Sequence, residues 1–392
     1  MPGNLKAKLI GVDLRCLMDP QISGVGEYAR QLLDYLFKID HLNQYRLLAN
    51  SRRDVSLPAW DYPNVKLFKF NWPNKIFNTN LKLNPFFNLD KLLGGVDIFF
   101  APNWQFIRLS SDAKLVLTVH DLSFEQLPNH YSFKRRRWHQ AVDTRRLCQR
   151  ADKIIAVSNT TRDDLVNLYQ LPYQRIKVIY SGLSPIYRPL PKDAAILTRV
   201  REKYKLTKKF ILSAGSFEPR KNLAALLKAF EKVPPDVDLV IIGPHQNPYR
   251  DWFSPANTFH KLLSDNSKRG RVKVLGYVDE ETKVALYNLA SVFVYPSLYE
   301  GFGFPPLEAM ACGAPVISSS TGALLETLGQ AALLVDPTAI NQLVLAISQT
   351  LTNNELARQL KQRGIERARH FNWTTTAAQT LKIFESLCLT HD

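Results

Sequence analysis

Short apolar runs rich in β-branched residues alternate with longer amphipathic stretches along the whole chain. Each short run predicts a strand, and its continuous apolar character predicts burial of both faces. In the first half, the predicted strands are Lys8–Val12, Tyr45–Asn50, Val65–Phe70, Asp97–Ala101, Lys114–His120, Lys153–Ser158 and Arg175–Tyr180. In the second half, they are Phe210–Gly215, Val237–Gly243, Val272–Leu275, Val292–Tyr295, Pro315–Ser318 and Ala331–Val335. The longer stretches predict helices, among them Gly26–Ile39, Asn222–Val233, Glu280–Ala290 and Leu307–Cys312.

Strands that alternate with helices in this way form parallel sheets whose two faces are covered by the helices. The alternation occurs twice, so the sequence predicts an α/β protein with two doubly wound units. The length of 392 residues agrees with two units, because a domain has roughly 150 residues. We place the boundary between Leu183 and Lys209, where three prolines interrupt regular structure. After Thr338 only helices are predicted, at Asn341–Leu351, Asn354–His370 and Thr374–Leu387.

Basic residues outnumber acidic ones, with 51 Lys and Arg against 35 Asp and Glu and a formal net charge of +16. This charge favours partners that carry phosphate, such as nucleic acid, an anionic lipid surface or a phosphorylated small molecule. Residues 1–185 hold 26 basic and 16 acidic side chains, so most of the excess lies in the first half. It is concentrated in Lys134–Arg150, where a helix is expected to begin. That segment predicts either contact with an anionic membrane surface or an ordinary solvated helix face.

The cysteines indicate a reducing compartment, since they form no disulfide framework or zinc-binding spacing. They are Cys16, Cys148, Cys312 and Cys388. The first residues lack the apolar segment of a secretory signal, and no window of about 20 apolar residues predicts a transmembrane helix. We therefore expect a cytoplasmic protein, and peripheral attachment to the inner face of the membrane stays open.

The first loop with candidate chemistry follows the opening strand of the second unit, at Ser213–Asn222. Gly215 allows a tight turn, and Arg220 and Lys221 place two cations near the start of a helix. Helix N-termini attract anions, so the pair suits a diphosphate. The alternative is a solvated helix start with two surface cations, although cations there oppose the helix dipole.

The second loop, Tyr299–Ser318, follows the predicted strand Val292–Tyr295 and leads into a helix. Its glycines allow close approach of the backbone to a ligand. Glu300 lies in the loop and Glu308 about one turn into the helix, so both carboxylates can accept hydrogen bonds from sugar or ribose hydroxyls. The alternative makes Glu308 a first-turn residue that favours the helix dipole, and Glu300 a surface charge.

These residues carry a resemblance to a known family. The sequence EGFGFPPLEAMACGAPVISS, which begins at Glu300, resembles the signature of retaining glycosyltransferases of family 4, which adopt the GT-B fold. GSFEPRKN, beginning at Gly215, resembles that family's phosphate loop. SGVGEY from Ser23, TVHDL from Thr118 and SNTTRDDL from Ser158 match it as well, so the resemblance runs from about Gly11 to Trp373.

The resemblance implies two Rossmann-like domains that face a central cleft. Residues 1–183 would form an N-terminal, acceptor-side domain and residues 184–208 a linker. Residues 209–370 would form a C-terminal domain that binds the nucleotide sugar. A last helix, within residues 371–392, would pack back on the N-terminal domain.

The resemblance also implies roles for single residues. Arg220 and Lys221 would hold the diphosphate and stabilise the leaving group, and Glu300 would contact the donor sugar ring. Glu308 would accept the ribose hydroxyls, and His120 would contact the donor sugar near the reacting carbon. The remaining donor-binding positions are Gly24, Gly215, Ser216, Phe302, Gly303, Phe304 and Leu307. Ser216 stands where many relatives have an arginine, so one phosphate contact differs from the family pattern.

Among family members, the motifs look most like those of bacterial mannosyltransferases of polysaccharide assembly. The expected reaction transfers a hexose, with retention of configuration, from a nucleotide sugar to a glycan or lipid-linked acceptor. GDP-mannose is the first donor expected, and UDP-glucose or another UDP-hexose is the alternative. The leaving phosphate is expected to help deprotonate the acceptor, so no separate general base is assigned.

Other functions were weighed against this one. A nucleic-acid-binding protein has the net charge in its favour, but the sequence lacks zinc-finger spacing, an RNP aromatic motif and a basic arm, so no nucleic-acid partner is expected. A family member that binds glycans without transfer is disfavoured by the intact motif residues. Asp236 and Asp238 form the metal signature of another glycosyltransferase fold, but they lead into a buried strand and are interpreted as structural. We therefore expect no metal cofactor.

Overall fold

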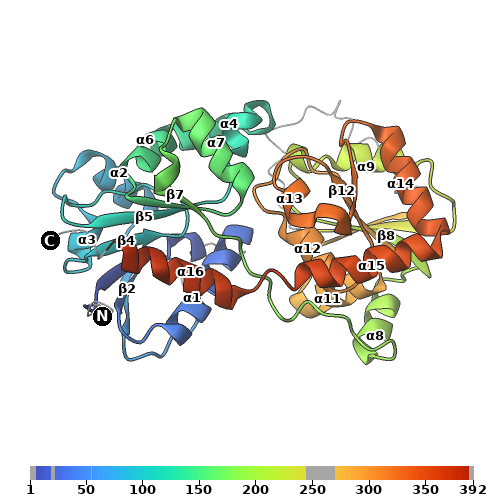
Figure 1. Cartoon of the computed structure of the whole chain (residues 1–392), viewed down its shortest axis with the longest axis horizontal. Helices are drawn as coiled ribbons and strands as arrows, with labels where there is room; N and C mark the ends of the chain where they lie inside the picture. Colours follow the sequence, from blue (N-terminus) through green and yellow to red (C-terminus); the bar gives the residue numbers. More distant parts are fainter. Residues whose placement is uncertain (1–5, 19–22, 54, 244–269, 388–392) are drawn as a thin grey trace. The chain divides into compact units, whose positions relative to one another are not determined.

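The computed structural model describes residues 6–18, 23–53, 55–243 and 270–387, and they divide into two compact units (Figure 1). Unit 1 consists of Met1–Leu122, Lys134–Gly182 and Asn372–Asp392. Unit 2 consists of Ser123–Phe133 and Leu183–Phe371. No helix among the described residues is both long and apolar enough to cross a membrane.

Unit 1 contains a parallel sheet of seven strands in the order β3-β2-β1-β4-β5-β6-β7. The strands are β1 (Leu9–Asp13), β2 (Gln44–Asn50), β3 (Val65–Phe70), β4 (Ile98–Ala101), β5 (Lys114–Val119), β6 (Lys153–Ala156) and β7 (Ile176–Val178). Their central members are buried on both faces, as their apolar sequences predicted. Three predicted strands end early, and one of them is β7, which stops at Val178 rather than Tyr180. His120 lies just beyond β5, and Ser158 lies beyond β6 because its side chain accepts a hydrogen bond from the Thr161 N–H and starts the next helix.

The helices of unit 1 lie on both sides of its sheet, with α16 beside α1 on one side (Figure 1). They are α1 (Gly24–Ile39), α2 (Asn74–Leu83), α3 (Leu89–Leu92), α5 (Phe133–Val142, which begins at the unit boundary), α6 (Thr144–Arg150), α7 (Asn159–Tyr169) and α16 (Trp373–Ser386). The basic segment, expected to start one helix, forms both α5 and α6. Asp143 separates them, because it adopts a left-handed conformation and accepts a hydrogen bond from the Arg146 N–H.

The C-terminal helix α16 packs on unit 1, which confirms the predicted return of the chain. Trp373 is buried at its start, against the ring of Tyr28 in α1. The start of α16 also passes close to Gly182. A Cβ at Gly182 would lie 2.3 Å from the Trp373 backbone nitrogen, so glycine is needed for this approach. The Thr376 hydroxyl donates a hydrogen bond to the carbonyl of Tyr180 at 2.8 Å.

Unit 2 contains a parallel sheet of six strands in the order β10-β9-β8-β11-β12-β13. The strands are β8 (Lys209–Ala214), β9 (Val237–Ile242), β10 (Val272–Gly276), β11 (Val292–Tyr295), β12 (Val316–Ser319) and β13 (Leu333–Val335). The helices are α4 (Ser123–Gln126), α8 (Ala195–Lys203), α9 (Leu223–Phe230), α11 (Glu280–Leu289), α12 (Phe304–Ala311), α13 (Leu324–Leu328), α14 (Ile340–Thr352) and α15 (Asn354–Ala368). The two parallel sheets confirm the predicted α/β class with two doubly wound units.

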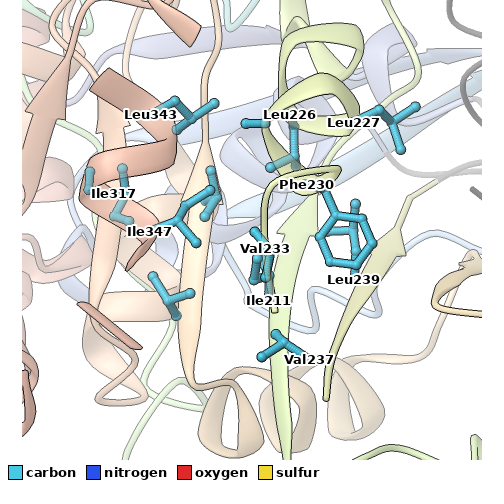
Figure 2. Close-up of a cluster of buried hydrophobic side chains, with 14 of the residues drawn as sticks. Ile211, Leu226, Leu227, Phe230, Val233, Val237, Leu239, Ile317, Leu343 and Ile347 are labelled. Atoms are coloured by element: carbon cyan, nitrogen blue, oxygen red, sulfur yellow. The ribbon is translucent and has the colours of Figure 1, made fainter. Parts of the chain in front are cut away.

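The core of unit 2 packs α9 and α14 against one face of the sheet (Figure 2). It draws on all six strands and the two helices, and its members include Ile211, Leu226, Leu227, Phe230, Val237, Leu239, Ile317, Leu343 and Ile347. Burial of one such side chain contributes about 1.5–3 kcal/mol. Because α9 begins two residues after Lys221, this packing also fixes the loop that carries Arg220 and Lys221.

The described cysteines are free thiols without catalytic character. Burial raises the pKa of Cys148 and Cys312 to about 12, and burial also raises that of Cys16. They therefore stay protonated at neutral pH. Cys388 lies outside the described residues.

Candidate active site

The strand order of each sheet reverses at one point, and ligands of such sheets bind beyond the carboxyl ends of the strands there. In unit 2, the reversal lies between β8 and β11. The loop after β8, Gly215–Asn222, and the loop after β11, Pro296–Gly303, therefore meet at this point. These are the two loops in which the sequence placed its candidate residues.

Lys221 and Glu300 join the two loops through a buried ion pair. The Lys221 Nζ lies 2.5 Å from Glu300 Oε1, and their exposed fractions are 9% and 7%. Lys221 also donates to the Tyr295 hydroxyl at 2.8 Å. The hydroxyls of Tyr295 and Ser297 donate to the same Glu300 oxygen at 2.9 and 2.7 Å. Three donors therefore meet at one oxygen of the Glu300 carboxylate.

Arg220 is the second cation at Glu300. Its Nη1 lies 3.3 Å from Glu300 Oε2 and donates to the carbonyl of Tyr299 at 3.3 Å. Its Nε lies 2.8 Å from Glu218 Oε2. Two cations and two carboxylates thus form one partly buried cluster with balanced charge, and we name Glu218, Arg220, Lys221 and Glu300 the cation cluster.

The backbones of the two loops are joined as well. The Leu298 N–H donates to the Arg220 carbonyl at 2.7 Å, and the Ser297 Oγ lies 3.0 Å from the same oxygen. At the end of β9, Gly243 has a φ of +150°, and a Cβ there would lie 1.9 Å from the Gly215 carbonyl oxygen. Only glycine fits at this approach, so Gly243 helps to place the loop after β8.

The electrostatics keep Glu300 ionised. Burial raises its pKa, but Lys221 and Arg220, with hydrogen bonds from Lys221 and Ser297, outweigh burial and lower the pKa to about 2 from an ordinary value of 4.5. Burial and the adjacent Arg220 lower the pKa of Lys221, and Glu300 opposes this shift. The carboxylate is therefore negative throughout the neutral range.

Glu308 lies in α12 and has a different set of partners. Its Oε2 accepts hydrogen bonds from the Tyr287 hydroxyl at 2.8 Å and pairs with Lys283 Nζ at 2.9 Å. Both partners come from α11. Glu308 is 7% exposed, and its described partners include none of the cation cluster. The structure therefore places the two predicted carboxylates in separate contact networks.

The other predicted donor-binding residues of unit 2 lie around the start of α12 and the end of β8. Gly303 precedes α12 with a φ of +94°, and a Cβ there would lie 2.5 Å from Leu324 Cδ2. α12 consequently starts at Phe304, before the predicted Leu307. The rings of Phe302 and Phe304 pack edge to face at 5.0 Å, and the Leu307 side chain is fully buried. Gly215 and Ser216 directly follow β8.

His120 and Gly24 lie in unit 1. Gly24 is the first residue of α1, after the Ser23 N-cap. The His120 Nε2 lies 2.8 Å from the carbonyl of Pro102, and its ring meets Tyr28 edge to face at 4.7 Å. Because a carbonyl only accepts, Nε2 carries a proton and the neutral ring keeps Nδ1 as an acceptor. Burial lowers the pKa of His120, although Pro102 and Asp121 oppose the shift.

Comparison with known proteins identifies the family. The family described as Glycosyltransferase Family 4 matches residues 22–185, and the one described as Glycosyl transferases group 1 matches residues 197–367. O-antigen chain mannosyltransferase B of Escherichia coli is 32% identical over 300 residues, which cover 74% of this chain and 74% of that protein. The chain belongs to glycosyltransferase family 4.

Solved structures agree on the fold. Sucrose-phosphate synthase from Thermosynechococcus elongatus has a TM-score of 0.77 at 23% identity, over 97% of this chain and 99% of that one. The Anabaena protein HepE, solved in complex with UDP-glucose, has a TM-score of 0.71 at 19% identity, over 97% and 100% of the two chains. The GT-B fold and the glycosyltransferase class predicted from the motifs are thus confirmed.

In this family 4 glycosyltransferase, the Asp-x-Asp sequence has structural surroundings. Asp238 is buried in β9 and pairs with Lys273 of β10 at 2.8 Å, whereas Asp236 is exposed before the strand. Among the described residues, no three His, Cys, Asp or Glu side chains gather as a metal site. The two aspartates therefore do not form a joint carboxylate site.

Sequence reasoning missed several partners of the family 4 carboxylates. Tyr295 and Ser297 bind Glu300, while Tyr287 and Lys283 bind Glu308. Tyr295 ends a strand and Ser297 lies five residues before Phe302, so nearness to the motif was their only signal. Lys283 and Tyr287 occur four residues apart in α11, on one helix face, but nothing in the sequence indicates that this face meets α12.

Proposed function

We propose that this protein transfers mannose from GDP-mannose to a glycan or lipid-linked acceptor, with retention of configuration and without a metal ion. The donor is inferred from the 32% identical relative, a mannosyltransferase named for an O-antigen chain. The site residues proposed for this reaction are those assigned above from the family motifs. UDP-hexose is the alternative donor, because a relative of the same fold was solved with UDP-glucose.

The main support for this proposal is the position of two cations. Arg220 and Lys221 lie together at the reversal point of the unit 2 sheet. In the reaction, the bond between the sugar carbon and the β-phosphate oxygen breaks, and negative charge develops on that phosphate. Fixed cations at this position stabilise the charge in a low-dielectric site. The acceptor hydroxyl forms the new bond, and its proton goes to the departing phosphate.

The cation cluster also suggests how the donor enters. Without a diphosphate, its two cations are balanced by Glu218 and Glu300. A bound diphosphate replaces these carboxylates as the partner of Arg220 and Lys221. Glu300 is then released toward the donor sugar, as the family motif implies. Glu308 accepts the ribose hydroxyls, and His120 contributes the acceptor atom Nδ1 to the sugar.

A donor panel tests the proposal. Purified protein is incubated with GDP-mannose, GDP-glucose, UDP-glucose and UDP-galactose, each with and without EDTA, and nucleoside diphosphate release is measured. We expect release from GDP-mannose, unchanged by EDTA. Release from UDP-glucose instead selects the alternative donor, and loss of activity in EDTA contradicts the metal-free reaction.

We further propose that the protein is cytoplasmic and attaches peripherally to the inner face of a membrane. In α5 and α6 the side chains of Lys134, Arg136 and Arg146 are exposed, whereas Arg145 and Arg150 donate to backbone carbonyls. A second region supports attachment. Val65–Asn88 contains four lysines and no acidic residue. It exposes the apolar side chains Leu67, Trp72, Ile76, Leu83 and Phe86.

Vesicle sedimentation tests this attachment. We expect binding to vesicles that contain phosphatidylglycerol, release in 0.5 M NaCl, and no binding to pure phosphatidylcholine. The double variants Lys75→Glu/Lys82→Glu and Arg136→Glu/Arg146→Glu compare the two regions. The region whose variant binds less contacts the surface, and equal binding by both variants and the wild type contradicts both regions.

A further inference from the structure

The carboxylate of Glu308 is held from one side only. Its Oε2 accepts from Tyr287 and pairs with Lys283, at 2.8 and 2.9 Å. Both of these contacts are made to Oε2, and the Tyr187 hydroxyl also lies near the carboxylate. Oε1 is not among the fully buried polar atoms without a partner. One oxygen is thus fixed, and the other is available to a ligand.

The two donors come from a single rigid element. Tyr287 and Lys283 are one helical turn apart in α11, and the Tyr287 ring is fully buried against Phe293 at 5.4 Å. Lys283 Nζ also donates to the Tyr187 hydroxyl at 2.9 Å. Tyr187 in turn donates to the carboxylate of Glu280. Each donor therefore has its position set by a second contact.

We propose that Tyr287 and Lys283 are positioning residues that aim Glu308 at the ribose of the nucleotide, with Tyr187 fixing the lysine. The inference rests on the proposed function, in which Glu308 accepts the ribose hydroxyls. A carboxylate with one oxygen fixed presents the other in a single orientation, so the hydrogen bond to ribose costs no reorganisation.

The chemistry of the donors suits this task. The tyrosine hydroxyl contributes a neutral hydrogen bond to Oε2, and Lys283 contributes a charge-assisted contact to the same oxygen. Burial, with the nearby Glu308, raises the pKa of both Tyr187 and Tyr287. Their hydroxyls consequently remain protonated donors across the working pH range.

The test compares ribonucleotides with analogues that lack the ribose hydroxyls. Binding of GDP and 2′,3′-dideoxy-GDP, and of the corresponding uridine pair, is measured by calorimetry for the wild type, Tyr287→Phe and Lys283→Met. The base that the wild type binds more tightly defines the pair. Tyr204→Phe is the matched control, because the Tyr204 hydroxyl makes no hydrogen bond among the described residues.

We expect the wild type and Tyr204→Phe to prefer the ribonucleotide by at least about 10-fold, the range of one hydrogen bond to a charged group. In Tyr287→Phe, ribonucleotide affinity falls by about that factor while dideoxy affinity is unchanged, so the preference disappears. Lys283→Met is expected to act in the same direction. In transfer assays, the KM for donor rises and kcat stays within about twofold.

Each other result has a definite meaning. If the wild type prefers the ribonucleotide and Tyr287→Phe keeps that preference, the positioning role is wrong and the proposed function survives. If Tyr287→Phe weakens both ligands equally, the tyrosine is structural, which also overturns the inference. If the wild type shows no preference, the ribose role of Glu308 fails, and the inference fails with it.

Discussion

The reversal points of the two sheets have the same topology and different chemistry. In unit 1 the strand order reverses between β1 and β4, and in unit 2 between β8 and β11. Each point has a buried ion pair after its first strand: Asp13 with Arg15 in unit 1, and Lys221 with Glu300 in unit 2. The first pair is two residues apart in the chain and the second is 79 residues apart.

The two pairs differ in what they hold together. We call the Asp13–Arg15 pair the brace, because it stabilises the segment that follows β1. Arg15 chelates Asp13 through two nitrogens at 2.9 and 2.6 Å and donates to the carbonyl of Phe106 at 2.9 Å. The two charges lie within one loop, and the neutral Phe106 carbonyl connects this loop to the one after β4. The charges of Lys221 and Glu300 instead come from two loops at the reversal point, where the proposed function places the diphosphate. Under the proposed function, the reversal point of unit 1 holds a structural pair and that of unit 2 a functional one.

The largest expected effect comes from Arg15→Met, which breaks the brace. It leaves the Asp13 carboxylate, 2% exposed, without its cation. Removing one partner of a buried pair costs about 3–5 kcal/mol. We expect the free energy of unfolding to fall by this amount in urea titrations followed by circular dichroism.

Arg358→Met is the control for the brace. Arg358 pairs with Glu355 one turn away in α15, and both side chains are more than half exposed. Exposed pairs contribute less than about 1 kcal/mol, so this variant should unfold almost as the wild type does. Equal losses for the two variants contradict the distinction between the buried brace and a surface pair.

Lys221→Met tests the ion pair of unit 2. We expect this variant to lose most of its transfer activity while its melting temperature changes little. Loss of a fixed group that stabilises transition-state charge lowers kcat by about 10²–10³-fold. Arg220 remains beside Glu300 in the variant, so the carboxylate keeps one cation. Donor hydrolysis and thermal melting measure the two effects. Transfer by this variant at the wild-type rate would contradict the proposed role of Lys221 at the diphosphate.

The sequence predicted the strands and the loops well because their signals are local. Buried parallel strands are continuous apolar runs, and the reversal-point loops carry glycines beside charged residues within a few positions. Val65–Phe70 and Val292–Tyr295 match β3 and β11 at both ends. Arg220, Lys221 and Glu300 were selected as candidates because each lies in such a loop. Their contact follows from the strand order, which the alternating pattern constrains.

What the sequence did not predict depends on which faces pack together. Glu300 and Glu308 are eight residues apart in one motif, and both were expected to contact the nucleotide sugar. The helix between them turns Glu308 toward α11, so its partners are Lys283 and Tyr287, while Glu300 meets the loop after β8. No local sequence pattern predicts which of these elements pack against each other. The break between α5 and α6 was missed for a related reason, because an aspartate in the left-handed conformation has no strong sequence signal.

Acid should weaken the unit 2 pair through Glu300. A carboxylate with a lowered pKa contributes stability above its ordinary pKa of 4.5, and loses it as the pH falls toward about 2. The shift corresponds to roughly 3 kcal/mol. We expect Glu300→Gln to be less stable than the wild type at pH 6 in urea titrations, and the difference to shrink at pH 3.

Glu355 is an exposed carboxylate that serves as the control for the buried Glu300. The pKa of Glu355 is also lowered, through hydrogen bonds from Arg358 and Gln359, but its side chain lies in solvent. Salt screens exposed charges far more than buried ones. In 0.5 M NaCl, the effect of Glu355→Gln should vanish and that of Glu300→Gln should persist. A salt-sensitive Glu300 would contradict its burial in the cation cluster.

The smallest effect concerns His120, the candidate residue of unit 1. Burial lowers its pKa from the ordinary 6.5, so the ring gains a proton only at more acidic pH. The neutral ring donates from Nε2 to Pro102, and the proposed function has Nδ1 accept from the sugar. We therefore expect kcat/KM to vary by less than about twofold between pH 6.5 and 8.5. A change in kcat/KM with an apparent pKa of 6.5 or above, absent in His120→Gln, would contradict this prediction. It would show that the ring titrates during transfer and that the sugar contacts a protonated, donating imidazolium.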